Sequence, residues 1–88
     1  MDKKKFLEIF ETAIGIEDIT HISVKVMQPN GKFEVITFGR DMFGAKYEYY
    51  RKAYDDEMKL NTFNQIYITS INFSNDVGCL VAEMFRNY

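Results

Sequence analysis

The chain has 88 residues, of which 47% are hydrophobic and 16% aromatic, and its formal net charge is −2 at pH 7. This length fits one small domain, which we expect to span residues 1–88. The aromatic content excludes a disordered chain, and the slightly acidic balance gives no overall attraction to nucleic acid or to an anionic membrane.

The first predicted element is an amphipathic helix from about Lys3 to Ile14. Its apolar residues fall on one arc of a helical wheel, and acidic residues lie opposite. Asp2 is suited to cap the amino end, and we expect Gly15 to end the helix in the left-handed conformation. The face that we expect to enter the core consists of Phe6, Leu7, Ile9, Phe10, Ala13 and Ile14.

A β-hairpin is predicted next, because apolar and polar residues alternate on both sides of the turn sequence QPNGK. Pro29 and Asn30 suit the centre of a type I turn, and Gly31 supplies the positive φ that closes a three-residue loop. This turn pairs Gln28 with Lys32, whereas a two-residue turn would move the apolar residues of the second strand to the other face. The expected facing pairs are therefore Ile22 with Phe38, Val24 with Ile36, and Val26 with Glu34.

A second helix is predicted from about Asp41 to Leu60, with Asp41 as its N-cap. Its apolar residues recur at helical spacing and form a narrow stripe, while charged residues occupy the far side. We interpret the stripe as core that packs on the sheet. The alternative is a partly open tyrosine surface for a partner, because interfaces favour tyrosine. The stripe consists of Phe43, Tyr47, Tyr50, Tyr54 and Met58.

The last third contains a β-rich segment, residues 64–73, and then a segment with two interpretations. Alternation puts one set of strand residues on one face, namely Tyr67, Thr69, Ile71 and Phe73, and puts Ile66 and Ile68 on the other. Residues 79–85 return as a fourth strand if residues 75–78 form a turn. If Asp76 caps a helix instead, the apolar stripe is Val77, Leu80, Val81, Met84, Phe85 and Tyr88. We favour the strand, because Gly78 would fall in the first turn of that helix at some cost.

Taken in chain order, these elements predict an α+β fold in a single small domain. The favoured order is α-β-β-α-β-β, in which two helices cover antiparallel hairpins. The helical interpretation of the last segment gives the alternative order α-β-β-α-β-α. No linker or low-complexity run interrupts this pattern.

The sequence has no arrangement of residues typical of catalysis or of metal binding. His21 is the only histidine and Cys79 the only cysteine, and we expect the thiol to be a small buried group without a base beside it. No cluster of carboxylates, histidine and cysteine has metal-ligand spacing, and no glycine-rich loop has the spacing of a nucleotide motif. We therefore expect a protein that is not an enzyme and has no catalytic residues, metal site or cofactor.

The favoured hypothesis for function is a small non-catalytic protein-binding module. It rests on the small size, the surplus of Tyr, Met and Phe, and the acidic helix faces. The predicted partner-binding residues are Tyr49, which lies off the apolar stripe, and the acidic run Asp55, Asp56 and Glu57. In its finer form, the hypothesis is a phage or mobile-element accessory protein that binds and modulates or inhibits a host enzyme.

Two alternative functions come from other features of the sequence. The first is a nucleic-acid-binding module with a local basic patch, for which the predicted contacts are Lys3, Lys4, Lys5, Lys25, Lys32 and Arg40. The second is a self-associating structural protein, in which an exposed sheet edge pairs two copies as a homodimer. One cysteine forms no internal disulfide and no stretch approaches the length of a membrane span, so we expect a cytoplasmic protein without membrane association.

Overall fold

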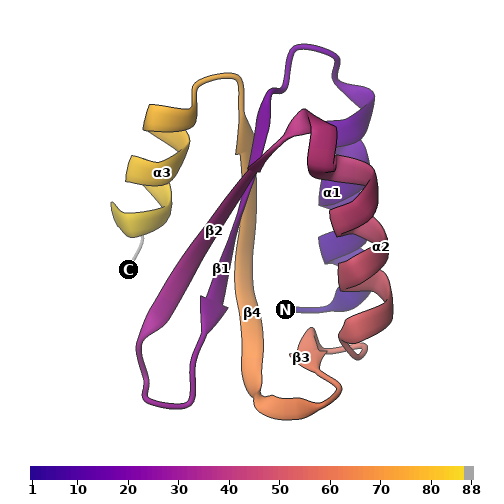
Figure 1. Cartoon of the computed structure of the whole chain (residues 1–88), viewed down its shortest axis with the longest axis vertical. Helices are drawn as coiled ribbons and strands as arrows, with labels where there is room; N and C mark the ends of the chain where they lie inside the picture. The colour runs from indigo at the N-terminus through magenta and orange to yellow at the C-terminus, as the bar shows by residue number, and fades with distance from the viewer. Residues whose placement is uncertain (87–88) are drawn as a thin grey trace.

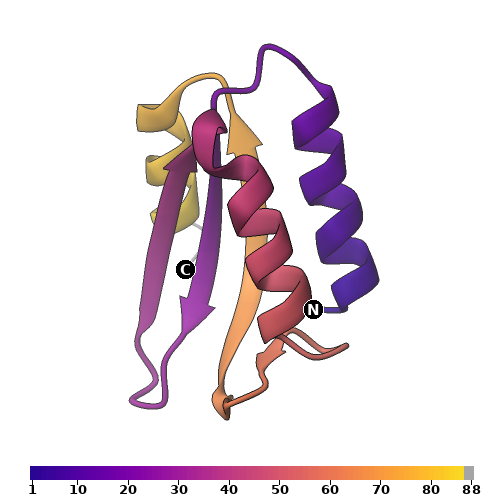
Figure 2. The same cartoon turned by 45° about the vertical axis from the view of Figure 1, so that its right-hand side comes forward.

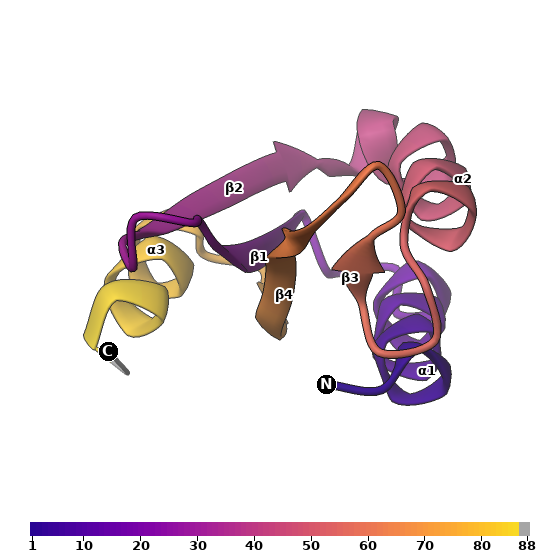
Figure 3. The ribbon, with the colours of Figure 1, turned by 90° about the horizontal axis from the view of Figure 1, so that it is seen from below.

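The computed structural model describes residues 1–86, and these residues form an α+β fold. The helices are α1 (Lys3–Gly15), α2 (Phe43–Ala53) and α3 (Val77–Arg86), and a short 3-10 helix, η1 (Arg40–Met42), precedes α2. The strands are β1 (His21–Met27), β2 (Phe33–Gly39), β3 (Lys59–Leu60) and β4 (Phe63–Ser74). They form one antiparallel sheet in the order β2-β1-β4-β3. Figures 1 and 3 show α1 and α2 on one face of this sheet and α3 on the other.

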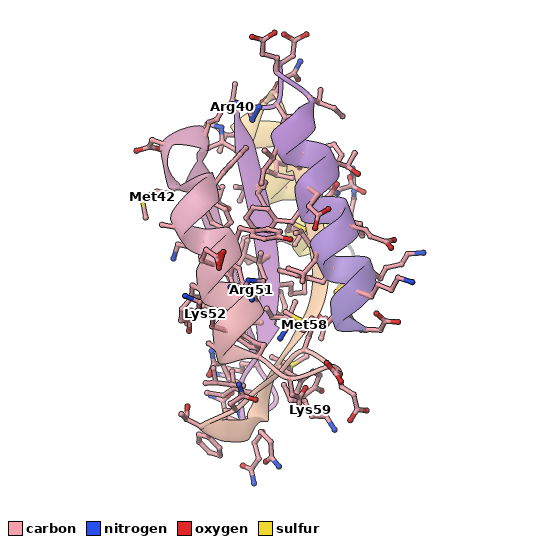
Figure 4. All side chains as sticks on the ribbon, turned by 90° about the vertical axis from the view of Figure 1, so that its right-hand side faces the viewer. Arg40, Met42, Arg51, Lys52, Met58 and Lys59 are labelled. Carbon is pink, nitrogen blue, oxygen red and sulfur yellow. The ribbon has the colours of Figure 1, made fainter. Side chains whose placement is uncertain are left out.

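Helix α1 begins as the sequence predicts but ends differently. Asp2 caps the amino end, where its carboxylate accepts a hydrogen bond from the third amide of the helix. Gly15 is the last helical residue and does not take the predicted left-handed conformation. Figure 4 shows Arg40 at this end of α1. Its guanidinium group donates to the carbonyl oxygens there, those of Ala13, Ile14 and Ile16.

The β1–β2 hairpin confirms the predicted turn and register. Gly31 has a φ of +81°, and the amide of Gln28 donates to the carbonyl oxygen of Lys32 over 2.8 Å. The facing pairs are the predicted ones: Ile22 with Phe38, Val24 with Ile36, and Val26 with Glu34. The five-residue turn sequence therefore determines the register of the hairpin, and the register determines which side chains of β2 face α1 and α2.

Strand β4 contains a β-bulge that the sequence did not reveal. Lys25 pairs with Ser70 and Val26 pairs with Ile68, so one extra residue of β4 lies between the two pairs. The predicted strict alternation is therefore wrong for the residues before the bulge, Ile66, Tyr67 and Ile68. The bulge turns Ile68 to the face that Ile71 also occupies, and the side chain of Ile68 is fully buried there.

The predicted helix from Asp41 to Leu60 is shorter at both ends. Asp41 lies in η1, and α2 ends at Ala53. The side chain of Asp55 explains the early end, because its Oδ1 accepts hydrogen bonds of 2.9 and 3.0 Å from two backbone amides of the following turn. Such local bonds offer the backbone an alternative to the helix.

The interpretation of the apolar stripe as core is confirmed, although the stripe continues past the helix. Phe43 and Tyr50 are buried on α2, and Tyr54 and Met58 are buried on the extended segment that follows. Met58 takes a positive φ of 59°, and Figure 4 shows it between the ends of α1 and α2. Tyr47 is only partly buried, and its hydroxyl donates to Glu11 of α1.

The last described segment is a helix, so the alternative order α-β-β-α-β-α is correct and the favoured fourth strand is wrong. Asp76 caps α3, since its Oδ1 accepts a hydrogen bond of 3.1 Å from the amide of Cys79. This cap and the burial of Leu80 and Met84 against the sheet offset the cost of a glycine in the first turn. Tyr88, which the helical interpretation included, lies outside the described residues.

Candidate functional site

Strand β2 forms a free edge of the sheet. It is bonded to β1 on one side, and no strand of the described chain lies on its other side. Figure 2 shows β2 at the border of the sheet, away from β4. The opposite edge is different, because β3 has only two residues and α1 packs beside β4.

The sequence of β2, FEVITFG, lacks the features that usually protect an edge strand. Natural edges are blunted by lysine, proline, bulges or short length. Strand β2 has seven residues, pairs with β1 without a register shift, and has Glu34 as its single charged residue. It therefore offers a regular ladder of backbone groups that another strand can extend.

The alternation of hydrogen-bonded and non-hydrogen-bonded pairs along the hairpin identifies which backbone groups of β2 face the free edge. The pair formed by Gln28 and Lys32 is hydrogen-bonded. Antiparallel strands alternate between residues that bond to one neighbour and residues that bond to the other. The groups that point away from β1 therefore belong to Phe33, Val35 and Thr37.

On the α2 side, the edge has a negative charge at one end and a positive charge at the other. Glu34 is exposed near the start of β2. Near its end, Lys46 of α2 places Nζ 5.7 Å from the centre of the Phe38 ring and 5.9 Å from that of Tyr49. Tyr49 is 48% exposed. A strand that is added here would therefore meet one acidic group, one basic group and one open aromatic ring.

On the α3 side, a second open aromatic ring flanks the edge. Phe85 is 52% exposed, and its ring centre lies 5.6 Å from that of Phe33 at the beginning of β2. Open aromatic rings on both sides of a strand give a bound segment apolar contact area on each face. The edge and its flanks consist of Phe33–Gly39, Lys46, Tyr49 and Phe85, and we call this set the β2 edge site.

The predicted partner-binding residues lie in two places. Tyr49 belongs to the β2 edge site, and its ring packs 6.1 Å from that of Tyr54. Asp56 and Glu57 are exposed on the turn after α2. Asp55 bonds to the backbone of its own turn. The hydrogen bond that its carboxylate accepts from the Lys59 amide, more than any other contact, holds the pKa of this carboxyl below the usual range. The structure thus places the acidic run on the turn and does not give its three carboxylates one common direction.

The predicted nucleic-acid contacts are distributed over different parts of the molecule. Lys3, Lys4 and Lys5 are in the first turn of α1, and Lys3 Nζ donates to the carbonyl oxygen of Tyr54 over 2.6 Å. Arg40 is bonded to the other end of this 13-residue helix, roughly 18 Å away at about 1.5 Å per residue. Lys32 is exposed in the hairpin loop, and Lys25 is buried on the α3 face. These side chains do not form one basic surface.

The groups with catalytic potential are not arranged as a nucleophile and its base. Cys79 is exposed, contrary to the expectation of a buried thiol, and its Sγ donates to Asp76. This hydrogen bond raises the pKa of the thiol, which opposes formation of the reactive thiolate. The ring Nδ1 of His21 is paired with the hydroxyl of Thr20. Within residues 1–86, no group of three or more His, Cys, Asp or Glu side chains is placed to hold a metal ion.

Two further findings concern the whole described chain. None of its helices within residues 1–86 has both the length and the apolar character needed to cross a membrane. Comparisons with protein-family models, with curated proteins and with solved structures found no match.

Sequence reasoning missed most of the β2 edge site. Glu34 and Phe38 were predicted only as hairpin pairs, and Phe85 only as part of an apolar stripe. The available signal was the hairpin strand with a single charge in seven residues. Its meaning depends on the strand order, because the same strand in the middle of a sheet would be ordinary core.

Proposed function

We propose that this protein is a small non-catalytic protein-binding module that binds an extended segment of its partner along β2. The observation that supports this most is the free, regular and almost uncharged β2 edge. Proteins that bind peptides by strand addition gain affinity from backbone hydrogen bonds and specificity from alternating side chains. The outward backbone groups of Val35 and Thr37 would supply the hydrogen bonds in this mode.

The charges of the β2 edge site define the chemistry of the proposed partner. A residue of an added antiparallel strand that lies opposite Glu34 would be basic. The residue opposite Phe38, close to Lys46, would be acidic. Facing residues of opposite charge favour a register, and like charges disfavour it. The proposed partner segment therefore has β-branched or aromatic residues, with a basic and an acidic residue four positions apart.

Self-association is a second candidate, because Glu34 of β2 supplies the acidic residue of this pattern and Lys46 of α2 supplies a basic group beside the strand. If two copies of β2 pair antiparallel about Ile36, Glu34 of one copy lies opposite Phe38 of the other. Lys46 of that second copy lies over the same Phe38 ring. Each of the two symmetry-related contacts would then bring a carboxylate close to an ammonium group. The resulting homodimer would have a continuous sheet across the two-fold axis.

We also propose the more specific role that was expected from the sequence. A module of this kind can act in the cytoplasm as a phage or mobile-element accessory protein that modulates or inhibits a host enzyme by occupying a strand edge. The non-catalytic part of the proposal is supported by the hydrogen bond that raises the pKa of the Cys79 thiol.

Selection of peptides from a displayed random library by the full chain tests the main proposal. We expect selected peptides to have the charge pattern above and to shift the amide resonances of Phe33, Val35 and Thr37. Glu34→Lys should weaken their binding by about fivefold or more, because an opposite-charge pair becomes a like-charge pair. Glu57→Lys makes the same reversal on the acidic turn and should leave the affinity unchanged.

Loss of binding in Glu57→Lys but not in Glu34→Lys would move the binding site to the acidic turn and contradict the β2 proposal. A dimer mass in light scattering would support self-association if Glu34→Lys gives monomers and Glu34→Lys with Lys46→Glu restores the dimer. In either case, Val35→Pro should abolish binding, because proline has no N–H to donate to the added strand. The N–H of Val35 points away from β1, so its loss leaves the β1–β2 hydrogen bonds in place.

A further inference from the structure

A pocket of about 380 Å³ lies between the sheet and α3, on the face opposite α1 and α2. Its apolar lining includes Met27, Phe33 and Met84. Its polar lining is formed by Lys25, Thr69, Ser70 and Asn72. A volume of this size falls within the usual range of small-molecule sites, about 300–1,000 Å³. No part of this pocket was predicted as a ligand site from the sequence.

Lys25 is the unusual residue of this pocket. It is only 7% exposed, although lysine is rarely this buried without a paired acid. Its Nζ lies 4.7 Å from the centre of the Phe33 ring. The ion pairs found in residues 1–86 join Arg51 with Glu48, Lys59 with Glu57, and Arg86 with Glu83, so none of them involves Lys25.

Among the described residues that line the pocket, the polar neighbours of Lys25 are hydrogen-bond donors and none is an acid. Ser70 pairs with Lys25 across β1 and β4 and lines the pocket, and its side chain carries a hydroxyl donor. Asn72 uses its Oδ1 to accept a hydrogen bond from the amide of Phe73, which leaves its NH₂ group as a donor. The hydroxyl of Thr69 donates to the carbonyl oxygen of Lys25, and this bond holds the bulge beside the pocket.

We propose that this pocket binds a small organic carboxylate. The carboxylate would lie between the Lys25 ammonium, the Ser70 hydroxyl and the Asn72 amide. The apolar body of the ligand would pack against Phe33 and Met84. A single cation among neutral donors suits a monoanion, and the apolar wall distinguishes such a ligand from inorganic phosphate. This site shares only Phe33 with the β2 edge site, and it does not depend on the proposed function.

Titration of the full chain with sodium benzoate, followed by amide resonances at constant ionic strength, tests the proposal. We expect saturable shifts at Lys25, Ser70 and Asn72. Benzyl alcohol has the same ring without the charge, and inorganic phosphate has the charge without the ring, so both should bind at least about tenfold more weakly. Equal shifts with benzyl alcohol, or saturation by phosphate alone, would overturn the assignment of a carboxylate site.

A matched pair of lysine variants tests the role of the ammonium group. Lys25→Met keeps the aliphatic length and should weaken benzoate binding at least about tenfold. Lys32→Met changes an exposed lysine of the same hairpin and should have no effect. If Lys25→Met does not fold, Ser70→Val removes a neighbouring donor in a residue suited to a strand and should also weaken binding. Unchanged benzoate affinity in the folded Lys25 or Ser70 variant would refute the proposal.

Discussion

Replacement of Tyr50 by alanine tests whether the tyrosine-rich stretch is core. Tyr50 is 1% exposed, and its ring centre lies 5.2 to 6.4 Å from those of the five aromatic residues around it, Phe6, Phe10, Phe38, Tyr49 and Tyr54. Truncation would leave a cavity among these rings. Large aromatic residues cost about 3–5 kcal/mol when they are truncated in a core. A chain of this length has a total stability of roughly 4–13 kcal/mol, so the variant should lose a large part of it.

Tyr49→Ala is the matched control, because it removes the same side chain from the adjacent position of the same helix. Tyr49 is 48% exposed, so its truncation should lower the free energy of unfolding by less than about 1 kcal/mol. Urea denaturation followed by circular dichroism measures both values, and an unchanged denaturant slope would show that the comparison is valid. Equal losses in the two variants, or a loss for Tyr50→Ala below about 1 kcal/mol, would refute the assignment of Tyr50 to the core.

Three further predictions concern the turns and the pH dependence. Asp55→Ala should cost about 1 kcal/mol in urea denaturation, as the loss of a capping carboxylate does, whereas Asp56→Ala should cost almost nothing; equal costs would contradict the bonding assigned to Asp55. Burial raises the pKa of Tyr54 to about 12 from 10.0, so the folded state holds this proton more tightly and stability should fall as pH rises from 10 to 12. Tyr54→Phe should reduce that fall, and an identical pH profile would contradict it. Gly31→Ala should lower the melting temperature because φ is +81°, whereas Gly15→Ala, in a helix with open space around the new methyl group, should raise it; shifts of the same sign would refute this.

The elements that could be predicted are those whose turn residues, caps and apolar face all lie within one short segment of the sequence. The hairpin is the clearest case, because Pro29, Asn30 and Gly31 determine both the turn type and the register. The first helix likewise has its cap and its apolar face within one short segment. In both segments, local preference and tertiary packing favour the same structure.

The errors occur where a single side chain or a tertiary contact changes a pattern. The periodicity of the second helix continues to Met58, and periodicity alone cannot reveal that Asp55 bonds the backbone of a turn. In the last segment, the cost of Gly78 in the first turn of a helix favoured a turn followed by a strand, but burial of Leu80 and Met84 on the sheet outweighs that cost. The bulge beside Lys25 has no local signature, since its position depends on how β4 pairs with β1.

The candidate sites depend on the strand order, which is a property of the whole fold. Strand β4 pairs with β1, and this leaves β2 at the edge, with no described strand on its outer side. The pocket also depends on the whole fold, because it forms where α3 is too short to cover the sheet. Strand β4 has 12 residues that rise about 3.3 Å each, whereas α3 has 10 residues that rise about 1.5 Å each, so the helix covers only part of the sheet. Met84, near the end of α3, lines the pocket that remains, and Lys25 is the charged group that the sheet presents there.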